Sequence, residues 1–260
     1  MGSFRKYGKP PFNIVVIHGG PGLPGDVAPI ANELASNFGI VEPFQTKDTI
    51  DGQVDELYRV LKNHCDYPVK LIGHSWGAWL ASIFTNYYHG FVEKLVLIGA
   101  GAFEERYNKD LFKTRIDRLT PKQKNDFFQL IEQLEFYEKT MTAEHFKRLG
   151  ELLLASDSFN CIESTIDIIE YQPHIFTSVW NEAKAMRKKG LLLKLGSKIQ
   201  CPVVALHGDY DPHPYKGVSE PLSKVIQDFR FYLLKQCGHY PWKERFAKDE
   251  FYKLLKMSLV

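Results

Sequence analysis

Short apolar runs alternate with helical patterns at both ends of the 260-residue chain, and this alternation most constrains how it can fold. In order along the chain, the predicted strands cover 12–17, 39–44, 69–72, 94–98, 203–206 and 229–234. The predicted helices cover 27–38, where Asp26 is placed to cap the helix, then 50–61, 78–88, 221–227 and 243–257. Alternating strands and helices form βαβ units. The sequence therefore predicts an α/β fold with a mainly parallel sheet and helices on both of its faces.

Strand patterns are missing between residues 102 and 190, where helix signals take their place. Thr120, Pro121 and Gln123 form a capping box with proline at the first helical position. Thr142 opens another helix, and Gly190 follows a basic helix end. We therefore expect a core made of residues 1–101 and 191–260, with residues 102–190 inserted as an all-helical cap.

Composition excludes several classes of protein. The chain is 44% hydrophobic and 25% charged, and its 33 basic and 31 acidic residues leave a net charge of +2. This balance gives no reason to expect a nucleic acid or an anionic membrane as partner. No apolar run approaches the ~18 residues of a membrane span, and no signal peptide is recognisable. The four cysteines form no CxxC pair and are interpreted as reduced thiols, so the expected location is the cytoplasm.

The motif Gly73-His74-Ser75-Trp76-Gly77 lies directly between a predicted strand and a predicted helix. In that setting G-x-S-x-G is typical of a nucleophile elbow, a strained turn that lifts the serine hydroxyl off the sheet. The two glycines let the strand and helix backbones approach closely. The helix N-terminus directs backbone N–H groups at a developing oxyanion. Ser75 is the predicted nucleophile.

A base and an acid follow Ser75 in the order that this chemistry requires. Asp211 lies on the loop after the strand 203–206, and His239 lies on the loop after the strand 229–234. The carboxyl ends of parallel strands meet at one edge of a sheet, so both loops are expected beside Ser75. Asp209 competes with Asp211 for the role of the acid. We favour Asp211 because the longer loop lets its carboxylate swing toward the histidine.

The other histidines receive structural interpretations. His74 is expected to point away from Ser75, His18 and His207 to tie down loops through a ring N–H, and His213 to be a loop residue. None of the nine histidines has the spacing of a metal motif such as H-E-x-x-H, so no metal site is predicted.

Two functions compete for the loop His18-Gly19-Gly20-Pro21-Gly22. Residues 20–25 match G-x-G-x-x-G, and Glu42 stands where a dinucleotide site places its ribose ligand. However, Pro21 and Pro24 remove N–H donors that such a site offers to a pyrophosphate. We favour the second interpretation, in which the N–H groups of Gly20 and Trp76 form an oxyanion hole.

The motifs HGGPG, GHSWG, HGDYD and CGHYPW occur in the order seen in the α/β-hydrolase superfamily, which the chain resembles over nearly its whole length. HGGPG resembles the proline iminopeptidase-like branch in particular, whose members cleave N-terminal residues or hydrolyse esters. The resemblance implies Ser75 as nucleophile, His239 as base, Asp211 as orienting acid, Gly20 and Trp76 as oxyanion donors, and no cofactor. The chain departs from that branch in two ways. His74 replaces the usual glycine, and the usual N-terminal hairpin is expected to be missing or trimmed.

The sequence thus predicts a serine hydrolase that cleaves a carboxylic ester or amide of a small-molecule substrate. Aromatic residues in 102–190 favour an apolar acyl or alkyl group, although most of them are expected to pack the cap itself. A proline iminopeptidase-like aminopeptidase is the alternative, with Glu104, Glu132 and Glu163 as candidates to bind an amine. A nucleotide-dependent oxidoreductase and a non-catalytic ligand-binding protein are more distant alternatives. The sequence predicts no oligomeric state.

Overall fold

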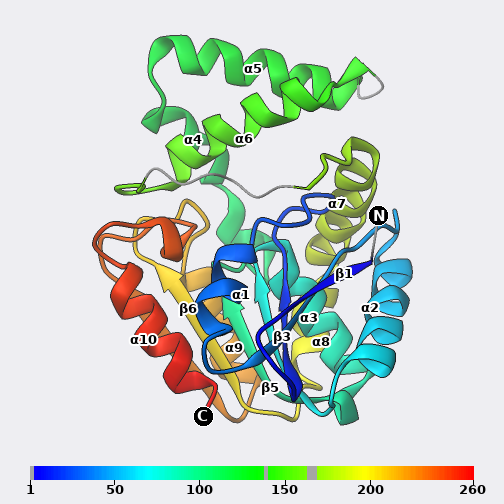
Figure 1. Ribbon diagram of the computed structural model, residues 1–260. Coiled ribbons are helices and arrows are strands. Elements are labelled where there is room, and N and C mark those ends of the chain that lie inside the picture. Colours follow the sequence, from blue (N-terminus) through cyan, green and yellow to red (C-terminus); the bar gives the residue numbers. More distant parts are fainter. Residues whose placement is uncertain (1–2, 138–139, 163–168) are drawn as a thin grey trace.

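The computed structural model describes residues 3–137, 140–162 and 169–260, and seven strands form its sheet in the order β1-β3-β2-β4-β5-β6-β7 (Figure 1). β1 runs antiparallel to β3, and every other neighbouring pair is parallel. The strands are β1 Phe4–Tyr7, β2 Phe12–Ile17, β3 Gly39–Pro43, β4 Val69–His74, β5 Val92–Ile98, β6 Val203–Gly208 and β7 Phe229–Leu234. The predicted α/β class with a mainly parallel sheet is confirmed.

β1 is the strand that the sequence did not predict. Its four residues, Phe-Arg-Lys-Tyr, carry no alternating apolar pattern, so local periodicity does not reveal a strand. Backbone pairing with β3 holds it, with Arg5 opposite Glu42, and the Tyr7 hydroxyl donates to the Glu42 carboxylate at 2.5 Å. One antiparallel strand therefore precedes the parallel sheet, where a trimmed or missing hairpin was expected.

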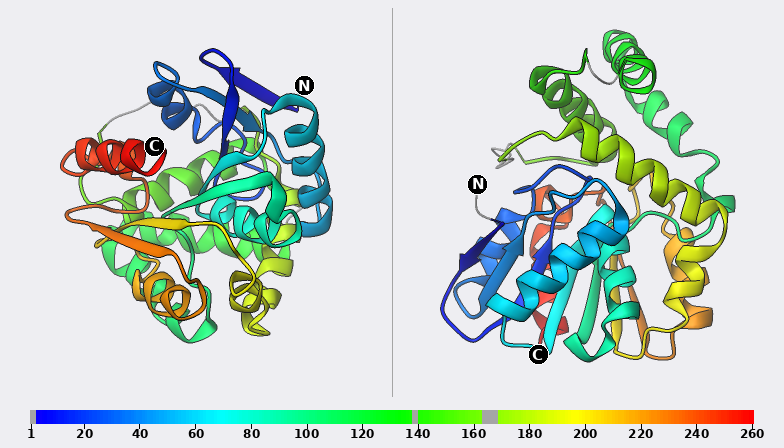
Figure 2. Two further views of the ribbon diagram at one scale, coloured as in Figure 1. Left: turned by 90° about the horizontal axis from the view of Figure 1, so that it is seen from below. Right: turned by 90° about the vertical axis from the view of Figure 1, so that its right-hand side faces the viewer.

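Helices cover both faces of the sheet (Figure 2). One face packs against α2 Ile50–His64, α3 Trp76–Tyr87, α8 Leu191–Gly196 and α9 Lys216–Val225. The other face packs against α1 Ala28–Leu34 and α10 Lys248–Ser258. Successive residues of β2 alternate between the two cores: Val15 belongs to the first and Val16 to the second. This two-sided burial explains why the central strands are continuous apolar runs.

Two helices differ from the sequence prediction. Asp26 was expected to cap the helix over 27–38, but α1 begins at Ala28 after Val27, and the Asp26 carboxylate instead accepts the Gly19 N–H. α9 begins five residues before Pro221, which lies inside it. Pro221 cannot donate to the carbonyl of Gly217, and the Phe103 N–H occupies that carbonyl at 3.0 Å. A partner far away in sequence thus satisfies the group that the proline leaves free.

Between β5 and β6 the described residues form helices joined by turns and extended segments, with Cys161 making a single bridge to Glu244. The helices before α8 are the short turn Glu105–Asn108, α4 Leu111–Arg118, α5 Pro121–Phe136, α6 Ala143–Asp157 and α7 Pro173–Lys188. Thr120 and Thr142 make the predicted N-terminal caps of α5 and α6. Figure 1 shows α4, α5 and α6 above the edge at which the parallel strands end. Among the described residues, no helix is both long and apolar enough to cross a membrane.

α4, α5 and α6 pack around a small hydrophobic core of their own. Phe127 and Leu130 of α5 pack against Leu149 and Leu152 of α6, with Leu119 closing the end. These residues account for part of the apolar content of 102–190. The division into residues 1–101 with 191–260 and residues 102–190 remains a prediction, since the elements themselves do not show where a domain would end.

Candidate active site

The turn between β4 and α3 holds Ser75 in a strained conformation. Ser75 has φ 52° and ψ −114°, a region that non-glycine residues rarely occupy. Its N–H donates to the Ile98 carbonyl at the end of β5, at 2.9 Å, which ties the turn to the neighbouring strand. The strain persists because surrounding contacts hold it.

The two glycines of G-x-S-x-G lie where the neighbouring backbone leaves no room for a side chain. A Cβ on Gly73 would lie 2.2 Å from the Gly77 oxygen, and one on Gly77 would lie 2.5 Å from the Ile17 and His18 oxygens. Real Cβ atoms do not approach backbone so closely, so only glycine lets α3 begin directly over the ends of β2 and β4.

The loops after β6 and β7 bring Asp211 and His239 together. The His239 Nδ1–H donates to Asp211 Oδ2 at 2.8 Å, and both side chains are buried. Burial alone would lower the pKa of His239, but the charge of Asp211 and this hydrogen bond outweigh it and raise the pKa above its ordinary value. Burial alone would raise the pKa of Asp211, but His239, His213 and His207 together lower it. The pair is therefore an ionised carboxylate that orients a basic imidazole.

Asp209, the competing acid, is engaged elsewhere. Its Oδ1 accepts the Cys237 N–H at 3.3 Å, and its Oδ2 lies 3.7 Å from the Lys235 ammonium. This geometry favours Asp211 as the partner of His239.

Asp211 contacts three imidazoles rather than one. Its Oδ1 accepts both the His213 backbone N–H at 2.9 Å and the His213 Nδ1–H at 3.2 Å. His207 Nε2 lies 3.3 Å from Oδ2 and donates to the His213 carbonyl at 2.9 Å, so it ties down this loop as the sequence predicted for it.

Asp211, His213 and His239 are also the residues in the described chain whose ligand atoms lie close enough together to hold a metal ion, within 4.8 Å of one another. The rings of His213 and His239, however, are stacked with centroids 4.7 Å apart and planes inclined by 29°. Nitrogen lone pairs on stacked rings run side by side and do not converge on one point, whereas a metal needs converging ligands. The arrangement favours two imidazoles that share a carboxylate over a metal centre.

The two predicted oxyanion donors, Gly20 and Trp76, lie on the loop after β2 and at the start of α3. Gly20 has φ 43°, and Trp76 is the first residue of α3, where a backbone N–H has no partner within the helix. Gly19 is not a competing donor, because both oxygens of Asp26 take its N–H at 3.1 and 3.2 Å. The Trp76 side chain lies on the other side of the turn, with its indole N–H donating to Gln53 at 3.1 Å. Within the described residues, no group accepts the N–H of Gly20 or that of Trp76.

The helical region reaches the site through α4 and α6. The carbonyl of Asp157, the last residue of α6, accepts the His239 N–H at 2.8 Å. The Asp157 carboxylate is buried and binds the Arg115 guanidinium of α4, with Nε 2.9 Å from Oδ1. A Cβ on Gly238 would lie 2.0 Å from the Asp157 oxygen, so glycine before His239 lets this contact form. The backbone of α6 thus helps to position His239.

The aromatic residues described within 102–190 range from buried to exposed, and Tyr107, Tyr171, Phe176 and Trp180 are half-buried. Phe103, Phe127 and Phe146 are buried. Those that expose at least 41% of their surface are Phe112, Phe128, Phe136, Tyr137 and Phe159. Among the candidates for amine binding, Glu104 is paired with Arg106 at 2.8 Å and Glu132 is exposed. Glu163 lies outside the described residues.

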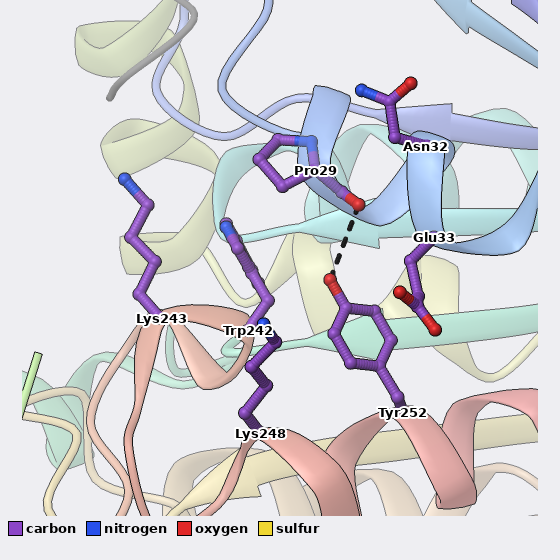
Figure 3. Close-up of a pocket in the computed structure, with 7 residues that line it drawn as sticks. All are labelled: Pro29, Asn32, Glu33, Trp242, Lys243, Lys248 and Tyr252. Carbon is purple, nitrogen blue, oxygen red and sulfur yellow. Dashed lines mark hydrogen bonds between the residues drawn. The ribbon is translucent and has the colours of Figure 1, made fainter. Parts of the chain in front are cut away.

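A further pocket of about 320 Å³ lies between α1 and the segment that leads into α10 (Figure 3). Tyr252 closes one side by donating to the Pro29 carbonyl at 3.4 Å, while Glu33, Lys243 and Lys248 bring charge to it. Its wall residue Trp242 packs edge-on against His74 with centroids 4.6 Å apart. This pocket is separate from Ser75, Asp211 and His239, which do not line it.

Two residues of the site escaped the sequence analysis. His213 was interpreted as a loop residue, although the Asp211-x-His213 spacing could have shown that both side chains of one turn share a function. Gly99 directly follows β5 with φ 51°, and a Cβ there would lie 2.9 Å from the His239 oxygen and 3.2 Å from its Nδ1. A glycine directly after a central strand was the available signal.

Comparisons with known proteins agree with this architecture. No known family profile matches the chain, and no curated protein matches its sequence. The crystal structure of VinJ superposes with a TM-score of 0.69 and 19% identity, covering 99% of this chain and 95% of that one. The meta-cleavage product hydrolase CumD from Pseudomonas fluorescens gives 0.66 and 16%, covering 98% and 92%. Est816, an N-acyl homoserine lactone degrading enzyme, gives 0.64 and 17%, covering 98% and 95%.

The chain therefore has the α/β-hydrolase fold, as the motif order predicted. Identities this low define the fold alone. The resemblance to the proline iminopeptidase-like branch remains a prediction.

Proposed function

We propose that the protein is a serine hydrolase that cleaves a carboxylic ester or amide of a small, apolar substrate through an acyl-enzyme on Ser75. The observation that carries the proposal is the 2.8 Å hydrogen bond between His239 and Asp211 at the sheet edge where Ser75 occupies its strained turn. A nucleophile at such a turn, a basic imidazole and an ionised carboxylate that orients it are the three parts of this mechanism.

In the proposed reaction, His239 Nε2 takes the proton of the Ser75 hydroxyl while Ser75 Oγ attacks the substrate carbonyl. The N–H groups of Gly20 and Trp76 hold the resulting oxyanion. His239 then gives its proton to the leaving group, and in the second half it activates the water that releases the acid product. Asp211 holds the imidazole with Nδ1 protonated and stabilises its cationic form. No cofactor takes part.

We further propose that residues 102–190 act as a cap that determines substrate choice. α4 and α6 lie above the strand ends (Figure 1), and Asp157 touches the backbone of His239. The position of these helices supports an influence on what reaches the site.

The dinucleotide alternative finds less support. Glu42, its ribose ligand, is buried on β3 beside β1 and accepts the Tyr7 hydroxyl. Asp26, close to the glycines of the loop, holds a backbone N–H that a phosphate would need. Glu42 and Asp26 are therefore both engaged in contacts within the protein.

A fluorophosphonate probe tests the proposal directly, because it reacts covalently with an activated serine. We expect labelling of the protein and of a Ser36→Ala control, whose exposed serine donates to the Glu33 carbonyl of α1, and no labelling of Ser75→Ala. Equal labelling of Ser75→Ala would refute Ser75 as the nucleophile, and absence of labelling in all three proteins would refute an activated serine.

The substrate class is tested by measuring turnover of acyl esters of increasing chain length beside aminoacyl amides. Preference for esters with apolar acyl groups is expected. A preference for aminoacyl amides with a free amine would support the aminopeptidase alternative. Ligand binding without any turnover, retained in Ser75→Ala, would support a non-catalytic binding protein.

A further inference from the structure

His213 makes more contacts with the Asp211–His239 pair than a loop residue requires. Its backbone N–H and its Nδ1–H both reach Asp211 Oδ1, while His239 takes Oδ2. Its ring stacks on the His239 ring with centroids 4.7 Å apart. His207 donates to the His213 carbonyl, which fixes the loop in this position.

We propose that His213 is a positioning residue: its imidazole holds one oxygen of Asp211 and draws negative charge toward it, which limits how strongly the other oxygen binds the His239 proton. The test by kcat/KM rests on the proposed function, whereas the test by titration of His239 does not. His213 acts through Asp211 and is not assigned any contact with substrate.

The physical reason lies in the two oxygens of one carboxylate. A carboxylate with an underused oxygen keeps more negative charge on the oxygen that faces His239. The N–H groups of His213 saturate Oδ1 and draw charge toward it, so Oδ2 binds the His239 proton less strongly than it otherwise would. A neutral His213 ring with its proton on Nδ1 is sufficient for this donation. Burial, together with the neighbouring His239 and Arg115, holds its pKa well below the ordinary value despite the charge of Asp211.

Other groups also face His239 and set the background for this effect. They are Asp211, His207, His74, Asp157, Arg115 and Tyr240. Asp211 is the group through which His213 acts, and the other side chains stay the same in a variant at residue 213, so a change in the titration of His239 reports on the contact between His213 and Asp211.

Two variants separate the donor from the bulk of the ring. His213→Phe keeps a stacked ring and the backbone N–H but removes the Nδ1–H. His213→Asn removes the ring but places an amide N–H near the position of Nδ1. The acid limb of the pH profile is the range in which kcat/KM rises with pH. We expect His213→Phe to move this limb to higher pH by on the order of one unit, so that at pH values below the limb kcat/KM is about tenfold lower than in the unaltered protein. His213→Asn should leave the limb in place. His89→Phe, at an exposed histidine, is the matched control and should behave like the unaltered protein.

Direct titration of His239 by NMR keeps the inference separate from the proposed function. The proton on His239 Nδ1, which faces Asp211, can be followed with pH without any substrate. The same upward movement is expected in His213→Phe, and it is expected even if the protein hydrolyses nothing. Failure of the proposed function would appear as no turnover in any variant, with this titration difference intact.

The inference is overturned if His213→Phe titrates like the unaltered protein, or if His213→Asn shifts as much as His213→Phe. A lower melting temperature without movement of the acid limb would also overturn it, because packing alone would then explain the residue. If His213→Phe does not fold, His213→Leu replaces it, with the same expected shift and the same contrary result.

Discussion

His74 Nε2 lies 3.1 Å from the backbone oxygen of His239, so the residue before Ser75 is bound to the backbone of the proposed base. The other ring nitrogen of His74 lies 3.5 Å from Asp26 Oδ2, and Asp26 holds the Gly19 N–H. The loops that carry the proposed oxyanion donor, the proposed nucleophile and the proposed base are thereby joined through one buried imidazole. The sequence interpretation gave His74 no such connecting role.

The identity of the acid can be tested with two matched substitutions. Asp211→Asn should lower kcat by about 10⁴-fold, because the amide favours the wrong tautomer of His239. Ser75→Ala and His239→Ala should each cost more, about 10⁶-fold. Asp209→Asn, whose carboxylate faces Cys237 and Lys235, should keep kcat within about threefold. Steady-state kinetics on an activated ester would measure all four; a damaging Asp209→Asn beside a benign Asp211→Asn would contradict the assignment.

The pH dependence of the rate follows from the pKa of His239. Only the neutral imidazole accepts the Ser75 proton, and Asp211 raises the pKa of His239 above its ordinary value of 6.5 despite burial. We therefore expect kcat/KM to rise with pH through an apparent pKa above 6.5 and then to level off. Measurement between about pH 5 and 9 checks this, since ordinary histidines titrate within that range. A limb below 6.5 would contradict the raised pKa.

The free energy of unfolding should also depend on pH, and this change is expected below pH 6.5. Burial lowers the pKa of His18, His74, His207 and His213 below the ordinary value of 6.5, so these rings remain neutral in the folded state. Below pH 6.5 the unfolded chain binds protons that the folded chain does not, and the free energy of unfolding falls. The expected slope is at most about 1.4 kcal/mol per pH unit for each such histidine; the raised pKa of His239 acts only above pH 6.5, where it adds stability as the pH falls.

Urea unfolding at several pH values measures this slope. Replacing His18 by Gln should make the slope shallower by up to one proton. A free energy of unfolding that stays constant from neutral pH down to about pH 5 would show that these histidines titrate alike in both states.

The Gly20 loop can be tested through its backbone. Gly20 has a positive φ, so Gly20→Val must change the backbone and move its N–H. Loss of one oxyanion donor should lower kcat by about 10²–10³-fold with little change in KM. Gly90→Val is the control, since a Cβ at Gly90 meets nothing within 4 Å. Full activity in a folded Gly20→Val protein would remove this loop from the mechanism.

Gly99 provides a test that separates backbone strain from contact with the pair. Gly99 and Gly190 both have positive φ, at 51° and 69°, but a Cβ meets His239 and Asp211 only at Gly99. Each alanine substitution should cost about 1–2 kcal/mol of stability from the left-handed backbone. Only Gly99→Ala should also lower kcat, by at least about tenfold, because His239 must shift away from Asp211. Melting temperatures and kcat for both variants give the comparison; equal kcat values would contradict it.

Local patterns sufficed to predict the parallel strands and most of the helices. The runs from Phe12, Val69 and Val203 are apolar because helices cover both sides of the sheet, and burial of this kind is visible in composition alone. The capping box at Thr120 is likewise a contact within four residues. β1 was missed because its stability comes from pairing with β3, 35 positions away at the contact between Tyr7 and Glu42.

In the candidate site, too, some features follow from local sequence and others from tertiary contacts. G-x-S-x-G between a strand and a helix is a local motif, so the sequence by itself determined where Ser75 lies and what its turn requires. Which carboxylate meets His239, what Asp26 binds and why His213 is buried were decided only by the tertiary structure. These contacts depend on where separate loops end in space: Asp211 and His239 are 28 residues apart, and His74 and His239 are 165 apart. Hydrogen bonds act over about 3 Å, and the position of a loop to that accuracy is set by the packing of the whole sheet and its helices.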